Sequence, residues 1–161
     1  MNIGITGHQK LEDSSLWDWV NTEIDKLLSK ETEPLVGLSS LAIGADQLFA
    51  KSILRSGGSL HAIIPFDGYE LKFSEGIHRE EYFRLLNQAT QVEILEWKES
   101  DELSYFNAGK RIVDLSDILF AVWNNKPAAG LGGTGDVVKY AIDLDKKVFH
   151  LNPITQTVVE K

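Results

Sequence analysis

Apolar residues follow two alternating patterns along the chain. Uninterrupted apolar runs, which are typical of strands covered on both faces, predict six strands at residues 2–6, 35–38, 60–64, 92–95, 118–123 and 147–151. Between these runs, apolar residues recur at spacings of three and four, which is the pattern of an amphipathic helix. This second pattern predicts five helices, over residues 16–28, 47–55, 74–90, 101–115 and 137–144.

The regular alternation of strands and helices indicates an α/β fold. Buried strands joined by helical crossovers form a parallel sheet with helices on both faces. We therefore expect three layers around a mostly parallel, doubly wound sheet of about six strands. Because the sequence has no linker, repeat or low-complexity segment, we expect a single domain over residues 1–155 and a short C-terminal tail over residues 156–161.

Three turns rich in small residues each follow a predicted strand. They are Gly4–His8, Ser39–Asp46 and Gly130–Asp136. In doubly wound sheets, ligands bind at the carboxyl ends of the strands, where the strand order reverses. If the strands before these turns are neighbours, the three turns meet at one edge of the sheet, and that edge is the expected binding site.

The third turn is the strongest candidate for a phosphate site. The segment Gly130-Leu-Gly-Gly-Thr-Gly-Asp136 places four glycines directly before a predicted helix. Glycine allows a ligand to approach the backbone closely, and a helix N-terminus offers unpaired N–H groups and the positive end of the helix dipole. The alternative is a flexible surface loop, but glycines at a helix start favour the phosphate interpretation.

Composition limits the partners and cofactors that we expect. The net charge is -8, which argues against a nucleic-acid partner because a nucleic-acid groove needs a basic face. Backbone amides still bind small phosphorylated ligands without net positive charge. The absence of cysteine and the scattered histidines predict no metal site and no cofactor. With no signal peptide and no long apolar run, we expect a cytoplasmic protein without a membrane partner.

Four side chains in or beside these turns have two interpretations each. Asp136 accepts a hydrogen bond either from ribose hydroxyls or from a backbone N–H at the start of the last helix. Asp46 has the same two interpretations at the start of the helix predicted over residues 47–55. His8 is either a contact to phosphate or an exposed turn residue without a role. Trp123 either stacks on a base or belongs to the core.

The glycine-bearing turns also resemble those of a known superfamily. The turn Gly4-Ile-Thr-Gly-His8, the run Gly37-Leu-Ser-Ser-Leu-Ala-Ile-Gly-Ala-Asp46, and Ser116-Asp117 before a strand leading to Gly132-Gly-Thr-Gly135 resemble the SLOG superfamily. This superfamily joins the DNA-processing protein Smf/DprA with the Lonely-guy phosphoribohydrolases, and the resemblance covers nearly the whole chain. It implies a Rossmann-like fold that binds a nucleotide or a nucleotide-derived ligand, with the phosphate on the late glycines.

Together, the turns and the resemblance define the predicted ligand-binding residues. They are Gly4, Thr6, Gly7, His8, Gly44, Ala45, Asp46, Gly130, Gly132, Gly133, Thr134, Gly135 and Asp136.

The catalytic half of the family motif is altered in this chain. Hydrolytic members carry P-G-G-x-G-T-x-x-E, whereas here Leu131 stands at the proline position, Asp136 replaces the threonine and Lys139 replaces the final glutamate. Those members also carry an Arg-Lys pair on the preceding helix, for which Lys110 and Arg111 are the nearest candidates. The candidate catalytic residues are therefore Asp136, Lys110 and Arg111, and Lys139 is expected to pair with Asp136.

Three functions are compatible with these observations. The first is a nucleotide-binding module that acts as a sensor or carrier. The second is a hydrolase that cleaves the N-glycosidic bond of a nucleoside monophosphate, and the third is a partner-binding domain without a ligand. The resemblance also implies a homodimer, for which the adjacent Tyr105 and Phe106 on the helix at 101–115 offer the direct support.

Overall fold

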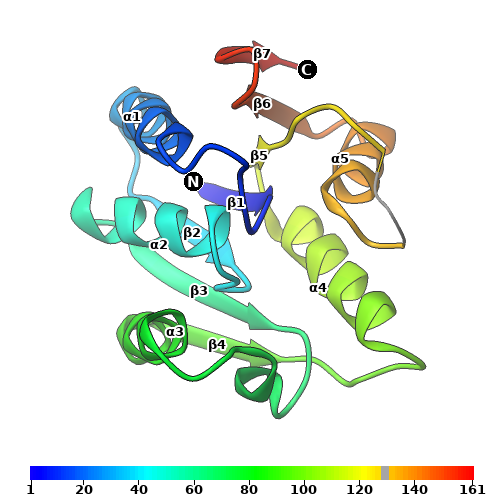
Figure 1. The fold of residues 1–161 in the computed structure, drawn as a ribbon. Coiled ribbons are helices and arrows are strands. Elements are labelled where there is room, and N and C mark those ends of the chain that lie inside the picture. Colours follow the sequence, from blue (N-terminus) through cyan, green and yellow to red (C-terminus); the bar gives the residue numbers. More distant parts are fainter. Residues whose placement is uncertain (128–130) are drawn as a thin grey trace.

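The computed structural model describes residues 1–127 and 131–161, which form one twisted sheet covered by helices on both faces (Figure 1). The sheet has seven strands in the order β4-β3-β2-β1-β5-β6-β7. Strands β1 to β6 are parallel to their neighbours, and β7 is antiparallel to β6. The strands are β1 (Asn2–Gly7), β2 (Val36–Ser39), β3 (Ser59–Ile64), β4 (Gln91–Ile94), β5 (Ile118–Val122), β6 (Lys147–Asn152) and β7 (Thr157–Glu160).

The helices form the two outer layers (Figure 1). Their bounds are α1 (Leu16–Ser29), α2 (Ala45–Arg55), α3 (Ile77–Gln88), α4 (Asp101–Leu115) and α5 (Thr134–Asp143), with a 3-10 turn, η1 (Tyr69–Lys72), before α3. Helices α1, α2 and α3 cover one face, whereas α4 and α5 cover the other. Alternate residues of one strand enter opposite cores: in β5, Phe120 packs with α1 and α2, and Leu119 packs with α4 and α5.

This architecture confirms the predicted three-layer, mostly parallel Rossmann-like fold. The C-terminus differs from the expectation, which was a tail over residues 156–161. Instead, the side chain of Asn152 accepts the backbone N–H groups of Ile154 and Thr155 at 3.0 and 3.4 Å, which stabilises a turn. The chain then reverses, and the β-branched Thr157-Val-Val segment adds β7 to the sheet.

The strand order reverses between β1 and β5. From β1 the chain proceeds outward through β2, β3 and β4, and it then returns through α4 to place β5 on the other side of β1. Because β2, β1 and β5 are neighbours, the turns that follow them lie at the same edge of the sheet, as the sequence predicted. The carboxyl ends of β1 and β5 mark the position where this fold class opens a binding crevice.

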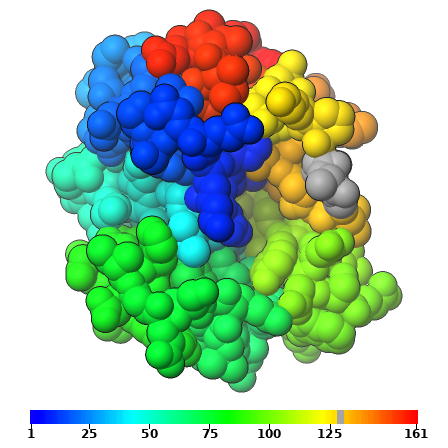
Figure 2. Space-filling model, in the orientation of Figure 1, coloured from blue at the N-terminus to red at the C-terminus, as the bar shows by residue number. Residues whose placement is uncertain are grey.

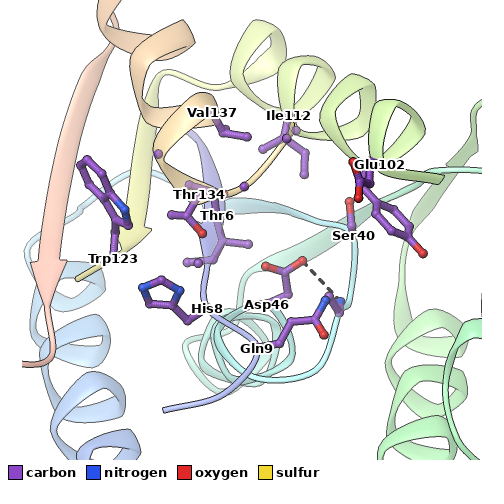
Figure 3. Close-up of a pocket in the computed structure, with 18 of the residues that line it drawn as sticks. Thr6, His8, Gln9, Ser40, Asp46, Glu102, Ile112, Trp123, Thr134 and Val137 are labelled. Carbon is purple, nitrogen blue, oxygen red and sulfur yellow. Dashed lines mark hydrogen bonds between the residues drawn. The ribbon is translucent and has the colours of Figure 1, made fainter. Parts of the chain in front are cut away.

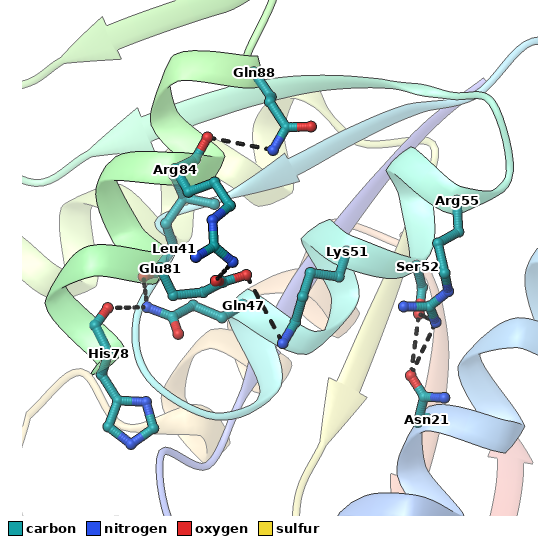
Figure 4. A network of polar contacts seen from close by, with 10 residues as sticks. All are labelled: Asn21, Leu41, Gln47, Lys51, Ser52, Arg55, His78, Glu81, Arg84 and Gln88. Atoms are coloured by element: carbon teal, nitrogen blue, oxygen red, sulfur yellow. Dashed lines mark hydrogen bonds and ion pairs between the residues drawn. The ribbon is translucent and has the colours of Figure 1, made fainter. Parts of the chain in front are cut away.

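A polar network fixes α2 between α1 and α3 (Figure 4). The buried Gln47 side chain donates to the backbone oxygens of Leu41 at 3.2 Å and His78 at 3.1 Å. On the opposite side of α2, Arg55 donates to Asn21 of α1 at 3.1 Å. Buried amides that pair with backbone oxygens avoid a desolvation penalty, so Gln47 holds the β2–α2 turn in a defined position.

Among the helices of the described residues, none has the length and apolar content that crossing a membrane requires. The cytoplasmic location stays a prediction.

Candidate functional site

A cleft of about 580 Å³ lies at the reversal point between β1 and β5. The surface is hollowed between the dark-blue end of β1 and the yellow-green of α4 (Figure 2). The close-up in Figure 3 shows side chains entering this cleft from β1, the β2–α2 turn, α4 and the start of α5. Eight of the predicted ligand-binding residues line it: Thr6, Gly7, His8, Asp46, Gly132, Gly133, Thr134 and Gly135.

Glycines beside the cleft allow β1 and α2 to pack closely. A Cβ on Gly7 would lie 2.6 Å from the Cβ of Ala45, and a Cβ on Gly44 would lie 2.6 Å from the backbone oxygens of His8 and Gln9. Gly44 also has φ of 88°, which favours glycine. Gly44 and Ala45 are absent from the lining of the cleft, so their visible role is to bring the first two turns together.

Three further predicted residues lie away from the cleft. Gly4 is buried within β1, where a Cβ would lie 2.4 Å from the Oγ of Ser116. Arg111 donates to Glu93 of β4 at 2.8 Å, and the Lys110 ammonium lies 4.8 Å from the centre of the Phe106 ring. The structure therefore places Lys110 and Arg111 on other surfaces of α4 and does not bring either to the cleft.

The glycine-rich turn is pressed against α4. Gly132 has φ of 86°, and a Cβ there would lie 2.9 Å from the backbone oxygen of Glu102. Gly133 is the N-cap of α5 with φ of -68° and ψ of 175°, a conformation open to any residue. Among the described residues, the N–H groups of Gly133, Thr134 and Gly135 have no hydrogen-bond acceptor. The predicted Gly130 lies outside the described residues.

Asp136 holds this turn in place. Its Oδ2 accepts the backbone N–H of Gly132 at 2.8 Å, an arrangement that resembles the third helical residue of a capping box. Asp136 is not among the residues that line the cleft. The geometry therefore favours the capping interpretation over a contact to ribose. Lys139 pairs with Asp143 at 2.6 Å, so the expected pairing of Lys139 with Asp136 is wrong.

Trp123 packs against the glycine-rich turn from the side of β5. A Cβ on Gly135 would lie 3.1 Å from the indole ring, so the bare backbone allows this contact. The centres of the Trp123 and His150 rings are 5.1 Å apart, and the indole N–H donates to the Lys126 backbone at 2.9 Å. These contacts show that the indole supports the turn. Trp123 also lines the cleft, so stacking on a base stays a prediction.

His8 is held as a neutral side chain. Its Nε2 accepts the backbone N–H of Asn124 at 3.0 Å, which requires that this nitrogen carry no proton. Burial lowers the pKa of His8 below its usual value, because a charged imidazole loses its hydration. His8 therefore presents a neutral ring to the cleft and ties the end of β1 to the segment after β5.

Asp46 is a buried acid on the opposite wall of the cleft. Its Oδ2 accepts the backbone N–H of Ala42 at 3.3 Å, and only 8% of the residue is exposed. Burial raises the pKa of Asp46 to about 7, against the opposing effect of backbone N–H groups of Ala42 and Ser40. In Figure 3 its carboxyl group points into the cleft between Thr6 and Ser40.

Sequence reasoning missed the wall that α4 contributes. Glu102 and Tyr105 line the cleft, and their spacing of three places them on one face of the helix. Tyr105 also stacks on Phe66, with ring centres 5.9 Å apart. The sequence feature that could have pointed to this part of α4 is Gly109, because glycine is uncommon within a helix. A Cβ there would lie 2.7 Å from Val137, so Gly109 lets α5 approach α4 closely.

By sequence, the chain matches no protein-family model and no curated protein. By structure, it is similar to DNA processing protein A (DprA) from Streptococcus pneumoniae, with 16% identity and a TM-score of 0.61. It is also similar to DprA from Helicobacter pylori, with 15% identity and a TM-score of 0.65. The molybdenum cofactor carrier protein of Chlamydomonas reinhardtii is 17% identical, with a TM-score of 0.55. The matches cover 92%, 93% and 94% of this chain, respectively.

The chain is shorter than these proteins. It spans 49% of the Streptococcus protein, 64% of the Helicobacter protein and 75% of the Chlamydomonas protein. The similarity therefore concerns the Rossmann-like portion that they share with this chain.

The expectation that nucleic acid is excluded as a partner is wrong. DprA from Helicobacter pylori has this fold and is described as binding single-stranded DNA. Net charge describes the whole surface, whereas binding depends on the charges and N–H groups within one groove. An overall charge of -8 therefore does not exclude a nucleic acid.

The chain has the Rossmann-like fold that it shares with DprA and the molybdenum cofactor carrier protein. This fold and the cleft at the reversal point agree with the resemblance of the turns.

Proposed function

We propose that this domain binds a nucleotide or a nucleotide-derived ligand, with a phosphate at the start of α5. The observation that carries the proposal is the cleft of about 580 Å³ at the reversal point, into which the glycine-rich turn opens. Its volume is in the range of small-molecule sites. The N–H groups of Gly133, Thr134 and Gly135 lie at its rim, where a helix N-terminus favours an anion.

The proposal describes a sensor or carrier rather than an efficient hydrolase. Asp136 is engaged by the backbone of Gly132, and Lys139 is exposed and paired with Asp143. No carboxylate therefore stands at the position that the hydrolytic motif uses. Two structural neighbours, a DprA with a single-stranded DNA binding mode and a molybdenum cofactor carrier, support binding as the function and suggest ligands to test.

The first experiment measures ligand binding by thermal shift and calorimetry. The ligands are AMP, ADP, ADP-ribose and a short single-stranded oligodeoxynucleotide, with adenosine as the phosphate-free control. A ligand at one hundred times its Kd stabilises the fold by about 2.7 kcal/mol, which a thermal shift detects. If none of the phosphorylated ligands binds, the partner-binding alternative takes the place of this proposal.

The Gly133→Val variant tests the position of the phosphate. The φ and ψ angles of Gly133 accept a side chain, so the variant is expected to fold, while the added isopropyl group blocks approach to the α5 N–H groups. We expect at least about a tenfold loss of AMP affinity, which corresponds to one lost charge-assisted hydrogen bond. Adenosine binding should change little, and Gly133→Ala should give an intermediate loss.

Full affinity of Gly133→Val for AMP would place the phosphate elsewhere. Circular dichroism and the melting temperature of the variant without ligand establish that the fold is retained.

A further inference from the structure

The inference concerns the cleft wall formed by Asp46 and rests on the proposed function. Asp46 follows the N-cap of α2, and the carboxyl group faces the cleft rather than the protein core. Among the residues that the structure describes, its hydrogen-bond donors are the backbone N–H groups of Ala42, at 3.3 Å, and of Ser40. Within the described residues, no lysine or arginine pairs with it.

The groups around Asp46 do not supply a cation. His8, at the end of β1, is neutral because its Nε2 accepts the Asn124 N–H. Tyr69 of η1 and Tyr105 of α4 carry phenol groups, and the Asp46 carboxyl contributes to the raised pKa of Tyr69. Glu102 of α4 is a second acid at the cleft, and Lys126 is an exposed residue beyond β5. Beyond the backbone N–H groups of Ala42 and Ser40, further stabilisation of a carboxylate in this position comes from donors that enter the cleft.

The two ends of the cleft differ in the ligand groups that they accept. At α5, N–H groups that have no acceptor among the described residues suit an acceptor such as a phosphate oxygen. At α2, a carboxyl group suits a donor. Strands β5 and β2 are separated by β1, and neighbouring strands lie about 4.8 Å apart, so the carboxyl ends of these two strands are about 10 Å from each other. A nucleotide spans this separation between its phosphate and its sugar hydroxyls or base.

We propose that the ligand presents a hydrogen-bond donor, either a sugar hydroxyl or an amino group of the base, to the Asp46 carboxylate, and that binding releases a proton from Asp46 to solvent. The proton leaves the carboxyl oxygen, and the ligand donor takes its place. The pKa of about 7 in the free protein supports this, because Asp46 is then substantially protonated at neutral pH.

The sign of the pH dependence follows from this exchange. Below pH 7 the ligand must displace a proton, so binding weakens as the pH falls. Above pH 7 the carboxylate is already ionised, and the affinity reaches a plateau. We expect the affinity for AMP to rise by about tenfold between pH 5.5 and pH 8.

Calorimetry in two buffers of different ionisation enthalpy measures the proton directly. Near pH 6.5 we expect the release of about half a proton or more per AMP bound. Asp46→Asn should abolish the part of the release that Asp46 supplies and reduce the pH profile to that of the AMP phosphate, whose second pKa is about 6. At pH 8 it should also bind AMP about tenfold more weakly than the wild type, because a neutral amide replaces a charge-assisted acceptor.

Asp145→Asn is the matched control. It changes the net charge by the same amount, lies in the exposed turn between α5 and β6 at the opposite end of the sheet, and has φ of 56°, which asparagine tolerates well. This variant should retain the proton release and the pH profile of the wild type.

Ligand analogues separate the two sources of the donor. If a sugar hydroxyl faces Asp46, then 2′-deoxy-AMP or 3′-deoxy-AMP loses the affinity and the proton release, whereas IMP retains both. If the base amine faces Asp46, IMP loses the affinity and the proton release, whereas the deoxy analogues retain both. Binding of AMP with no proton release and an unchanged Asp46→Asn variant would refute this inference while leaving the proposed function intact. Failure of every nucleotide to bind would remove the proposed function itself.

Discussion

Asp46 is an acidic side chain that the fold removes from water without providing a cation. Its pKa is raised from 3.8 to about 7 by burial, so the folded state binds a proton more tightly than the unfolded chain. The stabilising contribution of the protonated acid is complete below pH 3.8 and is lost as the pH rises to about 7. Without a ligand, Asp46 therefore lowers the stability of the domain at neutral and higher pH.

This residue gives a prediction on stability that does not depend on any ligand. At pH 8, Asp46→Asn should raise the free energy of unfolding by about 2–4 kcal/mol, since each pKa unit corresponds to about 1.4 kcal/mol. At pH 4 the variant and the wild type should be nearly equal. Urea denaturation at both pH values measures the difference, with Asp145→Asn as the control. Equal stabilities at pH 8 would mean that Asp46 ionises without cost.

At the scale of elements, α5 combines the turn that we propose as a phosphate site with an altered catalytic position. Cleavage of an N-glycosidic bond builds positive charge on the ribose, which a nearby carboxylate stabilises. Lys139 occupies the position of that carboxylate and has the wrong sign of charge. Losing one such electrostatic group typically costs about a hundred- to a thousandfold in rate. We therefore expect AMP to be bound without efficient release of adenine.

Product analysis tests this expectation. The protein is incubated with AMP and other nucleoside monophosphates, and free base and ribose 5-phosphate are quantified. Turnover of about one per second or faster, an ordinary enzymic rate, would contradict the prediction and establish the hydrolase alternative. The effect of Asp136→Asn or Asp46→Asn on any turnover would then identify the responsible carboxylate.

The elements themselves were largely predictable because burial on both faces leaves a clear apolar pattern. The sequence predicted the bounds 101–115 of α4 as the structure has them, and all six parallel strands were located. It also placed the three turns at one edge, since parallel strands put their carboxyl ends together. The strand β7 was missed because its four residues are short of a clear pattern, and Val158 alone among them is partly buried against the core.

The cleft was predictable only in part, because side-chain contacts between distant segments leave no local pattern. The glycines near Thr134 are conspicuous in the sequence, whereas the wall of Glu102 and Tyr105 depends on tertiary contacts of α4, such as the stacking of Tyr105 on Phe66. The roles of Trp123 and Asp136 were also open, because the hydrogen bond that each side chain forms is possible with a ligand or with the protein's own backbone. The structure shows each of them engaged by the protein.

At the scale of the whole molecule, charge and shape inform different questions. The overall acidity of the chain suggested that nucleic acid was excluded, and the fold of a DNA-binding neighbour corrects that argument. The cleft combines N–H groups at α5 with a single carboxyl at α2, so its preferences follow from local groups. Assays with single-stranded DNA therefore belong beside those with mononucleotides.

The remaining prediction for the whole molecule is the homodimer, which rests on the resemblance. Its direct support has weakened: Tyr105 stacks on Phe66, and the Phe106 ring is covered by Lys110. The sheet instead exposes apolar side chains at and beyond its β4 edge, with Ile94 58% and Trp97 53% exposed. Exposed apolar edge strands are prone to pair with another chain.

Sedimentation velocity from low to high micromolar concentration tests the dimer. We expect a species of twice the 18.0 kDa monomer mass at the higher concentrations, and a monomer alone throughout would contradict the prediction. The Ile94→Lys variant distinguishes the two surfaces, because a buried lysine without a partner is costly. Loss of the dimer in this variant assigns the contact to the β4 edge, whereas its retention leaves α4 as the interface.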